Sequence, residues 1–397
     1  MSSTSPSLAA GAVWSSAFRP FFLLGSADGL LLMCHWLGVT AELWPGLTND
    51  LPRQLWHGHE MVFGFAAAVV VGFVLTALPS WANTTEIVGA RLRWLVGLWL
   101  AGRVAMILPM PPLIAALLDG ALFPVMAGML APQLARASNR YYLVLLPILV
   151  ALCAANLIFH GGIAAADAGA MSAGLRLAIH ALILLFVLTA GVLTPIFTGN
   201  ALREKGRDDA IPLLPWLDAL AAMTVVALAS ADLARLPAMT MGSLALLACA
   251  VHAVRLARWR GWRVVDAPLV LVMHLGYAWL TVAFGLKAAA ALAGGVTESA
   301  WVHAFTVGAL GMMMMGLMTR VTLRHTGRSL RVPATLLLAY ASMFVAAVLR
   351  VGAALGAPEP QWLKGSALLW AIAILLFFAR SGAMLWRESL PARPSIR

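Results

Sequence analysis

The sequence of 397 residues has little charge and almost no cysteine. Only 11% of its residues are Asp, Glu, Lys or Arg, whereas 62% are hydrophobic and the mean hydropathy is +0.89. A soluble protein usually carries about 25% charged residues. Its interior is too small to bury the apolar surface of a chain with as little charge as this one. The composition therefore excludes a soluble enzyme and predicts an integral membrane protein.

The three cysteines exclude a disulfide framework and a thiolate metal site. Cys34, Cys153 and Cys249 each lie inside an apolar run, and none belongs to a CxxC pair. The first 17 residues also lack the basic segment that opens a secretory signal peptide. We therefore expect no cleaved signal peptide, and we assign residues 1–17 to a cytoplasmic tail.

Apolar runs long enough to cross a bilayer recur along the whole chain. A spanning helix needs about 20 apolar residues, and breaks rich in proline and charge separate the runs. The sequence therefore predicts an all-α fold, a polytopic membrane helix bundle of about twelve transmembrane helices. The predicted spans are 18–38, 57–81, 92–110, 111–133, 140–160, 173–199, 211–230, 237–257, 267–291, 299–322, 332–354 and 361–386.

The basic residues indicate the direction of these helices. With the N-terminus inside, all but seven of the 27 Lys and Arg residues fall at cytoplasmic helix ends or loops, in agreement with the positive-inside rule. Topology thus explains the net charge of +11, and we expect no nucleic-acid partner. Both termini are predicted to be cytoplasmic, with a single domain over 18–386 and a C-terminal tail over 387–397. The seven exceptions are Arg53, Arg103, Arg176, Arg235, Lys287, Arg350 and Lys364.

Four of the nine histidines are predicted to share the outer leaflet, on the second, sixth and tenth spans. A helix rises about 1.5 Å per residue, which places His57, His59, His180 and His303 at similar depth. Imidazole is a common ligand of haem iron and copper, and we predict that this set holds a reactive metal centre. Residues two apart on a helix point about 200° apart. His57 and His59 therefore face one ion only if their segment is extended, and the sequence leaves both conformations open.

A second pair of histidines is predicted below the midplane. His252 and His274 lie on consecutive spans, each about 6–8 Å from the membrane centre by the helical rise. Two facing imidazoles are the axial ligands of a six-coordinate haem, so we predict a separate haem there. Alternatively, a hydrogen bond within the helix or to Tyr277 satisfies His274 without a metal.

Charged residues inside the spans are further candidates for function. Arg103 and Asp119 have similar depth on consecutive helices, which predicts a buried ion pair. The alternative is an arginine that holds a haem propionate and an aspartate in a proton relay. We predict Glu60, Asp119 and Arg103 as the catalytic residues, and the further relay candidates are Asp28, Asn156 and Lys287.

Seven short motifs are spread over residues 18–328. They are Phe18-Arg-Pro-Phe-Phe22, Trp56-His-Gly-His-Glu-Met61, Gly72-Phe-Val-Leu-Thr-Ala-Leu-Pro79, Leu98-Trp-Leu-Ala-Gly-Arg103, His274-Leu-Gly-Tyr-Ala-Trp279, His303-Ala-Phe-Thr-Val-Gly308 and Met318-Thr-Arg-Val-Thr-Leu-Arg-His-Thr-Gly-Arg328. Together they resemble the NnrS family of bacterial inner-membrane proteins. One departure stands near Pro195, where Val192 occupies the place of an arginine expected in a Gly-Gly-Arg pattern.

The resemblance implies haem b and copper as cofactors and a link to nitric oxide metabolism and nitrosative stress. It implies that His57, His59, His274 and His303 are ligands, and that Arg103 and Arg320 match family arginines. The predicted metal-binding residues are His57, His59, His180, His274 and His303. The predicted cofactor-binding residues are His252, His274, His303 and Arg320.

These features predict a multi-pass protein of the bacterial inner membrane that reduces two NO molecules to N2O with two electrons and two protons. The sequence leaves the electron donor open, with a quinol and a cytochrome as candidates, and NO would enter from the membrane lipid. Two alternatives remain open: a non-catalytic haem protein that senses or scavenges NO or transfers electrons, and, third, a secondary transporter. Transporter sites lie near the midplane, whereas most of these histidines lie in the outer leaflet.

Overall fold

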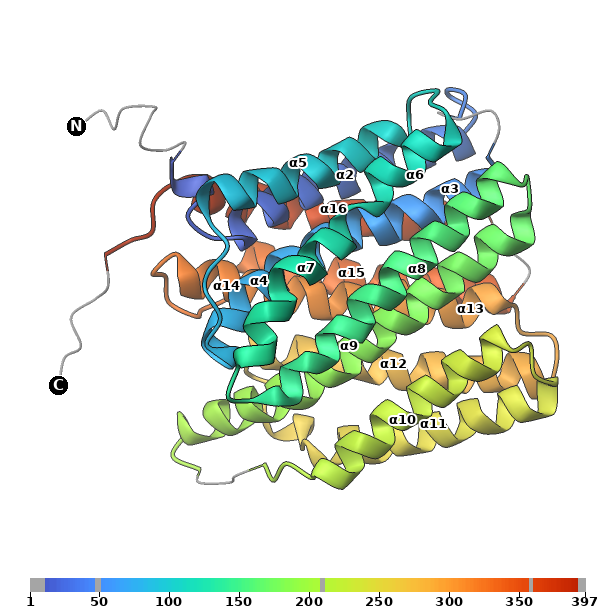
Figure 1. Ribbon diagram of the computed structural model, residues 1–397. Helices are drawn as coiled ribbons and strands as arrows, with labels where there is room; N and C mark the ends of the chain where they lie inside the picture. The colour runs from blue at the N-terminus through green and yellow to red at the C-terminus, as the bar shows by residue number, and fades with distance from the viewer. Residues whose placement is uncertain (1–10, 47–50, 208–210, 357–359, 392–397) are drawn as a thin grey trace. The chain divides into compact units, whose positions relative to one another are not determined.

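A computed structural model describes residues 11–46, 51–207, 211–356 and 360–391. Parts of both predicted tails, 1–10 and 392–397, lie outside these ranges. All regular structure in the described residues is helical (Figure 1). The protein is therefore an all-helical, polytopic membrane helix bundle, as the composition predicts.

The chain divides into two compact units. Unit 1 comprises Met1–Ala181, Arg320–Arg331 and Phe377–Arg397, and unit 2 comprises Leu182–Thr319 and Val332–Leu376. The single domain over 18–386 stays a prediction. We describe each unit by itself.

Unit 1 contains all the helices from α2 to α8. Helix α2 packs against α4, α5 against α6, and α8 against both α6 and α7. The bounds are α2 (Phe18–Thr40), α3 (Arg53–His59), the π-helix η1 (Glu60–Ala66), α4 (Ala67–Ala82), α5 (Gly89–Ala105), α6 (Pro112–Gly120), α7 (Leu122–Arg136), the 3₁₀ turn η2 (Arg140–Val144) and α8 (Leu145–Ala164).

Unit 2 is built around α12, which packs against α11, α13 and η4, while α10 packs against α11 (Figure 1). The bounds are α10 (Pro215–Leu233), α11 (Ala238–Arg258), the 3₁₀ turn η3 (Gly261–Arg263), α12 (Pro268–Leu292), α13 (Glu298–His303), the π-helix η4 (Ala304–Leu310) and α15 (Ala334–Leu355). Three helices contribute residues to both units: α9 (Ala168–Arg203), α14 (Gly311–His325) and α16 (Pro360–Trp386).

Every predicted span corresponds to a helical segment. Within the described residues, eleven segments are long and apolar enough to cross a membrane. The remaining predicted span, 92–110, corresponds to α5, which has 17 residues and contains three arginines. Seventeen residues extend about 26 Å along the helix axis, slightly less than the ~30 Å hydrocarbon core. The cytoplasmic location of both termini stays a prediction.

Proline and asparagine determine several helix ends. Pro112, Pro215 and Pro268 stand at the first turns of α6, α10 and α12. A backbone N–H at this position has no acceptor within the helix, so proline loses no hydrogen bond there. Helix α4 ends at Ala82, and the next residue, Asn83, has a φ of 52°, in the left-handed region that terminates many helices.

Glycines allow α2 and α4 to approach closely. A Cβ on Gly72 would lie 2.8 Å from Phe21 Cβ, and one on Gly25 would lie 2.9 Å from Ala68 Cβ. Real carbon atoms do not approach so closely without a shift of the backbone, and the Phe21 side chain is fully buried. The contact therefore fixes the position of the segment that leads from η1 into α4.

We predict that Gly72→Ala destabilises the protein and that Gly97→Ala, in α5, does not. The added methyl group at position 72 overpacks the contact with α2, at a cost of about 1–3 kcal/mol. A Cβ at Gly97 meets no atom within 4 Å, so alanine there gains up to about 1 kcal/mol of helix propensity. Thermal unfolding in detergent measures both effects, and equal melting temperatures for the two variants would contradict the close packing.

Candidate metal centre

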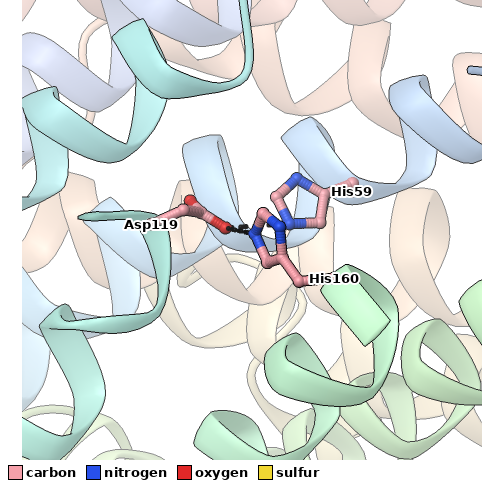
Figure 2. Close-up of side chains that lie close together, drawn as sticks. All are labelled: His59, Asp119 and His160. Atoms are coloured by element: carbon pink, nitrogen blue, oxygen red, sulfur yellow. Dashed lines mark hydrogen bonds and ion pairs between the residues drawn. The ribbon is translucent and has the colours of Figure 1, made fainter. Parts of the chain in front are cut away.

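Three side chains of unit 1 form a group that could hold a metal ion. His59, Asp119 and His160 are buried, and their potential ligand atoms lie within 4.8 Å of one another. They come from three segments: His59 ends α3, Asp119 lies near the end of α6, and His160 lies in α8. Figure 2 shows the Asp119 carboxylate turned toward the two imidazole rings.

The Asp119 Oδ2 atom joins the two histidines. It lies 3.1 Å from His59 Nε2 and 2.9 Å from His160 Nε2. Asn156, one helical turn before His160, donates through its Nδ2 to the same Oδ2 atom at 2.8 Å. The Asn156 Oδ1 atom therefore faces His59 Nε2, at 3.0 Å.

This arrangement leaves His59 with acceptors on both ring nitrogens. His59 Nδ1 donates to Glu60 Oε1 at 2.9 Å, whereas Nε2 faces the oxygens of Asp119 and Asn156. A neutral imidazole that donates through Nδ1 has only a lone pair at Nε2. A neutral imidazole carries one N–H and thus satisfies only one of these two sides, so a second proton or a metal ion would satisfy the other.

Arg103 compensates the carboxylates of the group. Its Nη1 donates to Glu60 Oε1 at 2.6 Å, and its Nη2 forms an ion pair with Asp119 Oδ1. All three side chains are buried. The predicted Arg103–Asp119 ion pair is confirmed, and Glu60 is a further partner of the same guanidinium.

Two glycines make room for these charges. A Cβ on Gly102 would lie 2.8 Å from Asp119 Oδ1, and one on Gly64 would lie 2.9 Å from Asp28 Oδ2 and 3.1 Å from Arg103 Nη1. The Asp28 Oδ2 atom is buried and has no hydrogen-bond partner among the described residues. Asp28 therefore adds a third carboxyl group beside Arg103.

Aromatic rings enclose the His59 side of the group. The Phe159 ring lies 4.4 Å and the Phe63 ring 4.9 Å from the His59 ring, centroid to centroid. Trp99 of α5 donates from Nε1 to the Gly64 carbonyl oxygen of η1 at 3.0 Å. Apolar walls keep bulk water away, so the charges in the group interact strongly.

His57 does not share the group with His59. The segment is helical rather than extended, so the two rings point apart. His57 stacks on Trp36 of α2, with ring centroids 4.2 Å apart. The structure thus decides the alternative that the sequence left open.

The remaining predicted site residues lie elsewhere on the chain. His180 is buried in the part of α9 that belongs to unit 1, and Arg320 lies in the part of α14 that belongs to unit 1. His303 lies in unit 2, and its Nδ1 donates to the Ser299 carbonyl oxygen at 2.8 Å. The metal centre predicted for His57, His59, His180 and His303 together stays a prediction.

His252 and His274 are buried in unit 2, and each contacts a side chain of the protein. His252 Nδ1 lies 2.6 Å from the Tyr277 hydroxyl, and Arg255 donates to the same hydroxyl at 2.8 Å. His274 Nε2 lies 2.9 Å from Thr198 Oγ1. The Tyr277 contact thus goes to His252 rather than to His274, and the haem between the two histidines stays a prediction.

Sequence reasoning missed His160 as a member of the group and gave Asn156 little weight. A signal for both was present, because they are four residues apart and therefore lie on one face of α8. The π-helix η1, which starts directly after His59, was also not predicted. A π-helix inserts an extra residue into a helical turn and is frequent at functional sites. A second π-helix, η4, starts directly after His303.

A family model described as NnrS protein matches residues 12–389 of the chain. A search of curated proteins finds no match to this sequence.

We predict strong coupling between Arg103 and Asp119 in a double-mutant cycle. Arg103→Met or Asp119→Asn alone costs about 3–5 kcal/mol, since each leaves buried charge uncompensated. The double variant should lose clearly less than the sum of both. Thermal unfolding in detergent gives the three values, and additive losses would contradict the pairing.

The exposed ion pair of Lys205 and Asp266 supplies the control. The hydrogen bond from the Lys205 ammonium lowers the pKa of the Asp266 carboxyl, but the Asp266 side chain is 67% exposed. Exposed pairs add little to stability. Lys205→Met and Asp266→Asn should therefore leave the melting temperature almost unchanged.

Proposed function

Because the chain belongs to the NnrS family, whose members are linked to the response to nitric oxide, we propose that it removes NO at the buried His59, Asp119 and His160 group. The reaction proposed is reduction of two NO to N2O in the bacterial inner membrane. The observation that carries the proposal is a pair of imidazoles and a carboxylate that converge inside membrane-spanning helices, where ionisable groups are costly and usually functional.

The donor atoms of this group fit a first-row transition metal. Imidazole nitrogen and carboxylate oxygen bind such ions. In many metal sites a carboxylate that does not touch the metal accepts the second N–H of a histidine ligand, and Glu60 stands in that place beside His59 Nδ1. A bound metal would supply an open coordination position for NO. Copper and haem b are the cofactors that the resemblance implies, and both are part of the proposal.

The chain offers a less direct fit for the proposed haem. His252 Nδ1 and His274 Nε2 are both engaged with protein hydroxyl groups. We therefore assign no reaction step to a haem.

The protein's own residues hold and insulate the centre. His59 and His160 would bind the metal ion, Asp119 lies between them, and Arg103 pairs with Asp119 and Glu60. Phe63 and Phe159 exclude water on one side. NO is small and apolar, so it reaches such a site directly from lipid.

A membrane quinol, QH2, would balance the reaction: QH2 + 2 NO gives Q + N2O + H2O. The quinol supplies two electrons and two protons. One oxygen atom of the two NO molecules leaves as water, and the N–N bond forms in N2O. Release of N2O therefore separates this function from binding of NO by a sensor or scavenger.

We predict that His59→Ala and His160→Ala lower anaerobic NO consumption at least about tenfold, together with bound metal. His35→Ala is the matched control, since His35 contacts the Trp56 ring and belongs to no predicted metal centre. An NO electrode and gas chromatography of N2O measure the rates with a quinol as electron donor. Full consumption in the His59 and His160 variants would refute the site, and tight NO binding without N2O would favour a sensor.

We predict that Glu60→Gln weakens metal binding about 10–100-fold, the usual effect of removing an outer carboxylate. Glutamine keeps the shape of Glu60 but loses the charge that holds His59 Nδ1–H and Arg103. Metal titration of the purified protein measures the affinity. Glu204→Gln, at an exposed position, should have wild-type affinity, and equal affinities for all three proteins would contradict the role of Glu60.

A further inference from the structure

The donor set of the unit 1 group contains nitrogen and oxygen but no sulfur. Two imidazoles and one carboxylate form the group, and the amide oxygen of Asn156 lies 3.0 Å from His59 Nε2. No cysteine within the described residues joins the group. Cu(I) prefers soft sulfur ligands, whereas two histidines with one carboxylate are typical of non-haem Fe(II).

The separations of the ligand atoms agree with that assignment. Asp119 Oδ2 lies 3.1 Å from His59 Nε2 and 2.9 Å from His160 Nε2. Two ligands at about 2.1 Å from an ion are about 3.0 Å apart at a right angle and about 3.4 Å apart at a tetrahedral angle. Both separations are nearer to the right-angle value, which neighbouring corners of an octahedron have. Further corners would remain available for small ligands.

We propose that His59, Asp119 and His160 bind a non-haem ferrous ion, and that this ion binds NO directly. Only the identity of the physiological ligand rests on the proposed function. Binding forms one bond between iron and the nitrogen of NO and transfers no net electron out of the complex. Copper, where present, would then use other ligands.

Electron paramagnetic resonance of the NO adduct tests the assignment. The full-length protein in detergent is stripped of metal, loaded anaerobically with Fe(II) and exposed to NO. A non-haem ferrous nitrosyl gives a spin-quartet signal, whereas a haem nitrosyl gives a doublet. We expect one quartet centre per chain, with an amplitude at least about tenfold lower in His160→Ala and Asp119→Asn.

Two variants keep the result interpretable. His57→Ala should retain the full quartet signal, because His57 lies outside the group. If Asp119→Asn fails to fold, His160→Gln removes a ligand while Arg103 and Asp119 stay paired. Absence of the quartet in folded wild-type protein, or a quartet unchanged in both ligand variants, overturns the inference.

The same samples separate this inference from the proposed function. A quartet signal without N2O release supports the iron site and refutes the enzyme. N2O release from protein that gives no quartet signal after iron loading supports the enzyme and refutes the iron site.

Discussion

Within unit 1, the central constraint is that the charged side chain of Arg103 is buried and therefore needs partners inside the protein. Its guanidinium forms ion pairs with Glu60 and Asp119, and Asp28 lies close by across Gly64. A buried charge is tolerated only when it is paired and hydrogen-bonded, so four helical segments must meet at this point. The same pairing holds Glu60 against His59 and Asp119 between the two histidines. One electrostatic requirement thus positions the candidate metal centre.

Backbone geometry supports this arrangement. Close glycine contacts set α4 against α2, and the π-helix η1 begins at the residue after His59. His59 is therefore the last residue of α3 and Glu60 the first residue of the π-helix, and their side chains contact each other at the candidate metal centre. The extra residue of a π-turn changes which side chains face the interior downstream. In unit 2, η4 follows His303 in the same way, but there the imidazole contacts Ser299.

Hydropathy and proline were sufficient to predict the helices. A segment that crosses a bilayer must be long and apolar, and all its backbone N–H and C=O groups must form hydrogen bonds within the protein. Depth was sufficient to predict that Arg103 and Asp119 pair. Depth does not determine rotation about a helix axis, so the sequence grouped His57 with His59 although their rings point apart. It also assigned no role to His160, whose Nε2 lies 2.9 Å from Asp119 Oδ2. The spacing of Asn156 and His160 held that information, but only the packing of α6 against α8 identifies their partner. The predicted roles of His180, His252, His274, His303 and Arg320 stay predictions.

X-ray absorption spectroscopy of the metal in the purified protein tests the central claim most directly, since it reports the ligands whatever the activity. The His59, Asp119 and His160 centre predicts a first shell of nitrogen and oxygen at about 2.0–2.2 Å, with the outer scattering of two imidazoles. It also predicts loss of the imidazole scattering in His160→Ala. A first shell that contains sulfur, a spectrum explained entirely by a porphyrin, or a metal spectrum unchanged in His160→Ala would contradict the account.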